Sequence, residues 1–299
     1  MISRSRWILA AAVGICFAGA AADPATQVRY ATGQSIVPVF EGWEKNADGS
    51  FKFVFGYMNR NYDEELDIPV GPNNMLEPGD VDRGQPTHFF NRRQQFMFKV
   101  RVPSDWGAKK DLVWTLTTRG KTEKAYASMI PFWEIGVDVY QQNRGGPEDD
   151  EDKGPTIQLV GEAKRTISLS DSLRVDVKVA DDGRPLPRAG RGGFPEGGRG
   201  AGRGDAGRSD PAASVMPRAE SPLTQMVVKN DPGVRLGVTW VVHRRSGSGN
   251  VTFAPQKPAV ANGSASTTIR FSERGTYVLR GYADDGILLD YADITVTVN

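Results

Sequence analysis

The stretch Gly275–Val298, GTYVLRGYADDGILLDYADITVTV, decides the fold class of the second half of this chain. Apolar and polar residues alternate on both sides of its Asp-Asp-Gly sequence, which is typical of β-strands joined by a turn. Upstream, Ser172–Gly183 repeats this pattern with a second Asp-Asp-Gly, and Val234–Arg244 forms an apolar run. We therefore predict about seven strands of one sandwich from Thr156 onward.

Two aromatic residues indicate which sandwich this is. Trp240 lies in the third predicted strand, and Tyr277 lies near the start of the sixth. These are the positions of the core tryptophan and of the tyrosine corner in an immunoglobulin-like sandwich. We predict an immunoglobulin-like domain with Trp240 in its core.

In order and spacing, this half of the chain resembles bacterial extracellular PKD-type immunoglobulin-like domains. The motifs that carry the resemblance are Asp181-Asp182-Gly183, Val238-Thr239-Trp240, Gly249–Phe253, Gly275–Leu279, Ala283–Gly286 and Ile294–Val298. The resemblance implies a secreted, non-catalytic module and implies no ligand. The chain departs from that family because about fifty residues separate Gly183 from the Trp240 strand.

Those intervening residues include a Gly- and Arg-rich tract. Arg188–Arg208 contains five Arg and nine Gly in 21 residues, and so few apolar side chains cannot offset the entropic cost of folding. We expect residues 186–231 to form a disordered insertion in a domain that spans 156–299. Arg-Gly tracts bind RNA, and Arg203-Gly204-Asp205 spells the integrin tripeptide; a basic tether for an anionic polymer or cell surface is a further interpretation.

The first 22 residues have the pattern of a secretory signal peptide. Arg4 and Arg6 precede a short apolar run, and small residues lead to Ala22. Export argues against an RNA partner, and no later apolar segment approaches the ~20 residues of a membrane-spanning helix. The one cysteine, Cys16, follows the bulky Ile15, which disfavours lipid attachment. We expect a secreted or periplasmic mature protein without disulfides.

The first half is also predicted to be a β-sandwich, over residues 25–147 and with six or more strands. Ile36–Lys45 and Ser50–Asn59 flank Asp48-Gly49, a pair typical of hairpin turns. Phe96–Val102 alternates apolar and polar residues, as a half-buried strand does. With motifs such as Phe55–Asn59, this half is similar to β domains of uncharacterised exported bacterial proteins, and that similarity implies no activity.

An acidic run connects the two halves. Glu148–Asp152 contains five consecutive acids between Gly- and Pro-containing turns. Consecutive like charges repel one another, so we predict a solvated linker over residues 148–155.

Four aspartates form the candidate metal site. The two Asp-Asp-Gly turns follow the second strand and separate the sixth from the seventh, and these loops share one pole of an immunoglobulin-like sandwich. Their carboxylates therefore suit Ca²⁺, which takes six to eight oxygen ligands. The alternative is that each Asp-Asp-Gly only makes a tight turn. The candidate ligands are Asp181, Asp182, Asp284 and Asp285, with Asp290 as a further possibility.

Trp106 is the candidate ligand contact in the first half. It lies in the polar turn Ser104–Gly107, where we expect an exposed indole able to stack on a sugar ring. The alternative is that it folds back onto the edge of the sandwich.

The chain offers little for catalysis. It has two histidines, His88 and His243, and neither a His-Glu-x-x-His nor a Gly-x-Ser-x-Gly motif. Its 37 basic and 36 acidic residues give no positive field for nucleic acid. We predict a non-enzymatic all-β scaffold, without a cofactor other than Ca²⁺, that binds a protein or polysaccharide at the cell envelope. The alternatives are a carbohydrate-binding or glycan-active protein and a subunit of an envelope assembly.

Overall fold

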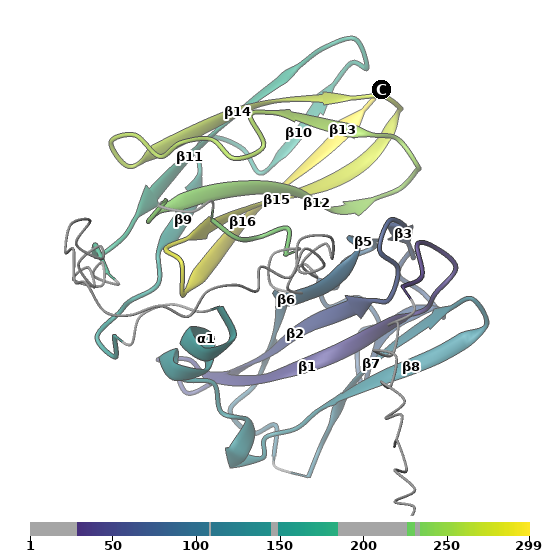
Figure 1. Cartoon of the computed structure of the whole chain (residues 1–299), viewed down its shortest axis with the longest axis vertical. Coiled ribbons are helices and arrows are strands. Elements are labelled where there is room, and N and C mark those ends of the chain that lie inside the picture. Colours follow the sequence, from purple (N-terminus) through teal and green to yellow (C-terminus); the bar gives the residue numbers. More distant parts are fainter. Residues whose placement is uncertain (1–28, 108, 145–148, 185–225, 231–233) are drawn as a thin grey trace, which may run out of the picture.

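The chain folds as two β-sandwiches that pack directly on each other (Figure 1). This computed structural model describes residues 29–107, 109–144, 149–184, 226–230 and 234–299. The predicted signal peptide and the Arg188–Arg208 tract lie outside the described residues. Among the described helices, none has the length and apolar character needed to cross a membrane.

The first sandwich contains eight strands and two short helices. One sheet has the order β1-β2-β6, the second has the order β4-β7-β8, and β3 pairs with β5. The strands are β1 (Ile36–Lys45), β2 (Phe51–Asn59), β3 (Leu66–Asp67), β4 (Asn74–Glu77), β5 (His88–Phe89), β6 (Arg92–Val102), β7 (Leu112–Thr118) and β8 (Lys121–Ala127). The 3₁₀ helix η1 (Pro131–Trp133) and the helix α1 (Val137–Arg144) follow.

Aromatic side chains fill the space between these two sheets. Phe55 of β2 stacks on Phe98 of β6 with 5.2 Å between the ring centroids, and Phe98 meets Trp114 of β7 edge to face at 4.9 Å. The Trp114 indole donates a hydrogen bond to Asn74 Oδ1 at 3.0 Å. Phe55, Phe98 and Trp114 thus point into the core from strands in both sheets, and Phe55 and Phe98 lie on the apolar faces that the sequence predicts.

The second sandwich has the strand pairing of an immunoglobulin-like fold. Its sheets have the orders β13-β14-β11-β9 and β10-β16-β15-β12. The strands are β9 (Thr156–Leu159), β10 (Lys164–Ile167), β11 (Leu173–Ala180), β12 (Gly237–Arg245), β13 (Val251–Ala254), β14 (Ser264–Phe271), β15 (Gly275–Asp284) and β16 (Leu289–Val298). There are eight strands rather than about seven, because the first is divided between the sheets and β10 pairs in parallel with β16.

Both aromatic markers occupy the predicted places. The Trp240 side chain is fully buried in the second core. The Tyr277 hydroxyl donates a hydrogen bond to the Glu273 carbonyl at 2.9 Å, the contact that defines a tyrosine corner. These contacts confirm the immunoglobulin-like prediction.

A continuous apolar core joins the two sandwiches. Val241, Tyr282 and Leu289 of the second sandwich belong to the same buried cluster as the core of the first. The prediction of a half-buried β6 is therefore wrong at Met97, which is 2% exposed because the second sandwich covers it. Its carbonyl accepts hydrogen bonds from Arg280 Nη1 at 2.8 Å and from the Tyr282 hydroxyl at 2.7 Å.

Two connecting segments are also better packed than predicted. Within the acidic run, Asp150 and Glu151 are exposed, whereas Asp149 binds Arg184 at 2.7 Å and the Asp152 side chain is buried. At the other connection, residues 226–230 belong to the predicted disordered insertion, yet Val228 is buried and the Val227 amide donates to Gln94 Oε1 at 2.9 Å. Residues 226–230 therefore contact the first sandwich, whereas the acidic run is held by Arg184 and Asp182 of the second.

Candidate functional site

A polar cavity of about 310 Å³ opens between the two sandwiches. We call it the junction pocket. The first sandwich contributes β5 and its neighbours, and the second contributes β12 and the segment around β13. The lining residues are Glu65, His88, Phe90, Val241, Val242, Arg245, Asn250, Val251, Thr252, Phe253 and Gln256.

Backbone pairing fixes the position of His88 in this pocket. β5 pairs with β3, and this register sets His88 opposite Asp67. The other side of β5 meets β12 of the second sandwich, where the Thr87 amide donates to the His243 carbonyl at 3.1 Å. The Arg245 amide donates to Thr87 Oγ1 at 3.2 Å. The pocket therefore joins the sandwiches through hydrogen-bonded strands.

Carboxylates hold both nitrogens of the His88 ring. Nδ1 lies 3.0 Å from Asp67 Oδ1, and Nε2 lies 3.1 Å from Glu65 Oε2. The residue is 4% exposed. Burial lowers the pKa of His88, but the hydrogen bonds to Asp67 and Glu65 outweigh that effect and leave the pKa above its usual value. The geometry and the pKa both favour a charged imidazolium clamped between two acids.

Arg245 completes this cluster of charges. Its Nε and Nη2 bind the two oxygens of Asp67 at 2.8 and 2.5 Å, and its Nη1 donates to the Gly249 carbonyl at 3.1 Å. Burial raises the pKa of Asp67, but the hydrogen bonds from His88 and Arg245 outweigh that effect and leave the pKa below its usual value. Asp67 is therefore an ionised carboxylate shared by two cations from different sandwiches.

This arrangement does not suit general acid–base catalysis. A catalytic base needs a ring nitrogen within reach of a substrate proton, and in His88 both nitrogens face carboxylates. The other histidine of the chain, His243, is buried, and its Nε2 lies 2.9 Å from the Gly84 carbonyl. Burial lowers the pKa of His243 well below its usual value. Neither histidine presents a nitrogen to solvent.

Trp106 does not line the junction pocket. It is 7% exposed, so the predicted exposed indole is not observed. Its Nε1 donates to the Lys110 carbonyl at 2.6 Å, and its ring meets Phe53 edge to face at 5.9 Å. The turn folds back because the indole buries more apolar area against the core than it could in solvent.

The predicted metal ligands separate into two environments. Asp284 is 1% exposed and forms an ion pair with Arg144 of α1, so it already has a counter-ion. Asp181, Asp182 and Asp285 instead lie close enough to Asp152, in the predicted linker, for their charges to act on one another. Asp290 is exposed on β16. In the described ranges, no three His, Cys, Asp or Glu side chains already converge on one metal position.

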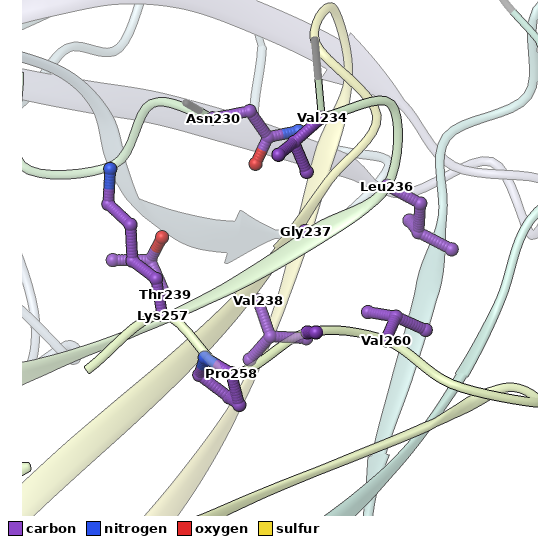
Figure 2. A pocket seen from close by; sticks show the side chains of 10 residues that line it. Asn230, Val234, Leu236, Gly237, Val238, Thr239, Lys257, Pro258 and Val260 are labelled. Carbon is purple, nitrogen blue, oxygen red and sulfur yellow. The ribbon is translucent and has the colours of Figure 1, made fainter. Parts of the chain in front are cut away.

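A second cavity, of about 270 Å³, lies beside β12. Figure 2 shows apolar side chains around it, including those of Leu236, Val238 and Val260. Lys257 also lines it and donates to the Lys229 carbonyl at 2.9 Å. This cavity has few polar groups with which to orient a ligand.

Comparison with known proteins assigns no family to the chain. No family model matches the chain. No curated protein matches it. Among solved structures, it is similar to a chimeric titin Z1Z2 carrying a decorin peptide, with 10% identity, 89% of this chain and 99% of the other covered, and a TM-score of 0.25. It is also similar to domains 4 and 5 of the S-layer protein SbsC, with 7% identity, coverage of 89% and 98%, and a TM-score of 0.22.

Immunoglobulin domains 1–4 of Sidekick-1 are a third similar structure. The identity is 9% and the TM-score is 0.22, over 90% of this chain and 51% of the other. The chain therefore spans about half the length of that structure.

Proposed function

We propose that this protein is a non-catalytic binding scaffold that acts outside the cytoplasm, at the cell envelope or surface. The signal-peptide pattern of residues 1–22 supports the location. The resemblance of the second sandwich to PKD-type domains supports the scaffold role. Loops held on a rigid β framework would supply the recognition surface.

The observation that carries this proposal is the locked junction between the sandwiches. Arg280 is buried there, binds Asp293 through two bonds of 2.7 and 2.8 Å, and also reaches the Met97 carbonyl. On the other side, Arg144 binds Asp284. A surface that spans both sandwiches is therefore preorganised, and a partner would pay little entropy to order it.

Sedimentation with envelope fragments tests the proposal. Residues 23–299 should sediment with cell-envelope fragments of the source organism in a saturable way. The Arg280→Met variant should remain folded by circular dichroism and bind more weakly, because it lacks one of the polar contacts that fix the sandwiches to each other. An absence of saturable binding, or a hydrolytic activity that His88→Asn abolishes, would contradict the proposal. Co-purification of one stoichiometric protein would favour an envelope-assembly subunit instead.

A second candidate function is glycan binding in the junction pocket. The pocket combines half-buried aromatic rings of Phe90 and Phe253 with polar side chains, among them Glu65, Asn250 and Gln256. Aromatic faces with a few hydrogen-bonding groups suit a compact polar ligand such as a sugar. This site replaces Trp106 as the candidate sugar contact.

Affinity electrophoresis in soluble polysaccharides tests this candidate. Migration of the wild-type protein should be retarded by at least one polysaccharide, and Asn250→Ala should reduce that retardation. Gln158→Ala, which removes an exposed amide on β9, serves as the matched control. Equal retardation of all three proteins would place any glycan site elsewhere.

A further inference from the structure

Five carboxylates gather where the linker between the sandwiches crosses the second one. We call them the junction acid cluster: Asp149, Asp152, Asp181, Asp182 and Asp285. The linker is held against two turns of the second sandwich. The Lys153 amide donates to Asp182 Oδ2 at 3.2 Å, and a Cβ on Gly154 would lie only 3.0 Å from Leu288 Cβ.

Asp152 is the central member of the cluster. It is 5% exposed, and among the described residues neither of its carboxylate oxygens has a hydrogen-bond partner. An ionised carboxylate in that position is costly unless a proton or a cation compensates it. The nearby cation, Arg184, already binds Asp149 at 2.7 Å and Glu151 at 2.5 Å.

Two neighbours of Asp152 also have one buried oxygen without a partner. Asp181 uses Oδ2 to accept the Gly183 amide at 2.9 Å, which leaves Oδ1 unpaired. Asp285 uses Oδ1 to accept the Ile287 and Leu288 amides, both at 2.7 Å, which leaves Oδ2 unpaired. Backbone amides therefore orient both carboxylates. Together with the two oxygens of Asp152, four carboxylate oxygens have no hydrogen-bond partner among the described residues.

These groups influence one another strongly. Burial and then the charges of Asp182, Asp149 and Asp181 raise the pKa of Asp152 to about 6. Burial is also the largest cause of a pKa of about 7 for Asp285, to which Asp152 contributes. Both shifts reflect the cost of placing several ionised carboxylates side by side in a partly buried site.

We propose that the junction acid cluster binds a divalent cation of the Ca²⁺ class through Asp152, Asp181 and Asp285. The donors are oxygens alone, without histidine or cysteine, which suits a hard cation. Ca²⁺ tolerates irregular geometry and fills its coordination with carbonyls and water, whereas Mg²⁺ requires near-octahedral ligands. Asp284 is not a ligand, because Arg144 already neutralises it.

Binding would draw three segments together. Among the described residues, no three His, Cys, Asp or Glu side chains form a ready-made metal site, so the three carboxylates would have to move together to share an ion. One lies in the linker, one follows β11 and one lies between β15 and β16. The ion would therefore close the linker onto both turns and strengthen the junction between the sandwiches.

Thermal unfolding of residues 23–299 at pH 7.5 tests the site, with 1 mM Ca²⁺, 1 mM Mg²⁺ or excess chelator. We expect Ca²⁺ to raise Tm by about 5 °C relative to chelator, and Mg²⁺ to raise it less. Isothermal titration should give one Ca²⁺ per chain. Equal Tm values in Ca²⁺ and chelator would overturn the proposal.

Asp152→Asn separates ion binding from a merely structural role. In chelator, the variant should melt at or above the wild-type Tm, because the substitution removes repulsion within the cluster. In Ca²⁺, the shift in Tm should disappear. Asp171→Asn, an exposed carboxylate between β10 and β11, should keep the full shift. A Ca²⁺ shift that persists in Asp152→Asn would exclude this site.

Discussion

The junction pocket and the junction acid cluster both lie where the two sandwiches meet, and both are rich in carboxylates. In the pocket, Asp67 is paired with His88 and Arg245, and on the neighbouring turn Asp82 binds Arg244 at 2.6 and 2.9 Å. In the acid cluster, Asp152 has no partner for either oxygen. The difference shows that a carboxylate at this junction can be neutralised by a cationic side chain or can remain without a hydrogen-bond partner.

The origin of the difference lies in β12. This strand ends with Arg244 and Arg245, and both point to acids of the first sandwich. The linker carries its acids to the other end of the same sandwich, where Arg184 is the cation that reaches them. Arg244 and Arg245 pair with the acids at one end, whereas at the other end Arg184 pairs with Asp149 and Glu151 rather than with Asp152.

The largest expected effect comes from turning a paired carboxylate into an unpaired one. Arg144→Met should lower the free energy of unfolding by roughly 3–5 kcal/mol, because it leaves Asp284 buried without a counter-ion. Chemical denaturation measures the loss. The double variant Arg144→Met/Asp284→Asn should recover most of it. A loss below about 1 kcal/mol in the single variant would show that this pair contributes no more than a surface ion pair.

A smaller effect is expected from the pH dependence of the two histidines. The pKa of His243 is depressed in the folded state, so the unfolded chain binds more protons below pH 6.5 and stability falls on acidification. The pKa of His88 is raised, so its contribution is complete below pH 6.5 and is lost as pH rises through the folded value. Each slope is at most about 1.4 kcal/mol per pH unit.

Urea denaturation between pH 5.5 and 8.5 measures both slopes. His243→Gln should reduce the loss of stability on the acid side relative to the wild type. His88→Gln should reduce the loss on the alkaline side. If both variants follow the wild-type profile, neither histidine controls stability in this range.

The smallest expected effect is a change in the pKa of His88 when its partner Asp67 is neutralised. Asp67→Asn should lower the pKa of His88, because it removes a charged hydrogen-bond acceptor and a nearby negative charge. NMR titration of the His88 ring measures the change. Asp171→Asn, remote in sequence from the pocket, should leave that pKa unchanged. A His88 pKa that stays constant in Asp67→Asn would assign its elevation to Glu65 alone.

Local sequence patterns predicted most of the fold. Alternating residues and Asp48-Gly49 predicted a hairpin, and the structure pairs β1 with β2 around that turn. The spacing of Trp240 and Tyr277 predicted the immunoglobulin-like core. These features depend on residues close together in the chain. The helix α1 was not predicted, since its helical stability comes from the packing of Tyr140 on Phe96, with 4.4 Å between the ring centroids.

The candidate sites were harder to predict because their partners are distant in sequence. Asp67 and Arg245 are 178 positions apart, and no local pattern links them. The two aspartates of one Asp-Asp-Gly turn look equivalent in the sequence, yet Asp284 meets an arginine of α1 and Asp285 does not. Asp152 resembled a solvated linker residue, since its burial depends on the linker lying against turns of the second sandwich that are distant in sequence.

The shared apolar core has a consequence for recombination of this chain. Immunoglobulin-like domains are often moved between proteins as separate modules, and their interfaces are usually small. A cut between α1 and β9 would expose Val241, Tyr282 and Leu289, and would leave Arg280 without the Met97 carbonyl. We therefore expect the pair of sandwiches, rather than either one alone, to be the smallest piece that keeps this core closed.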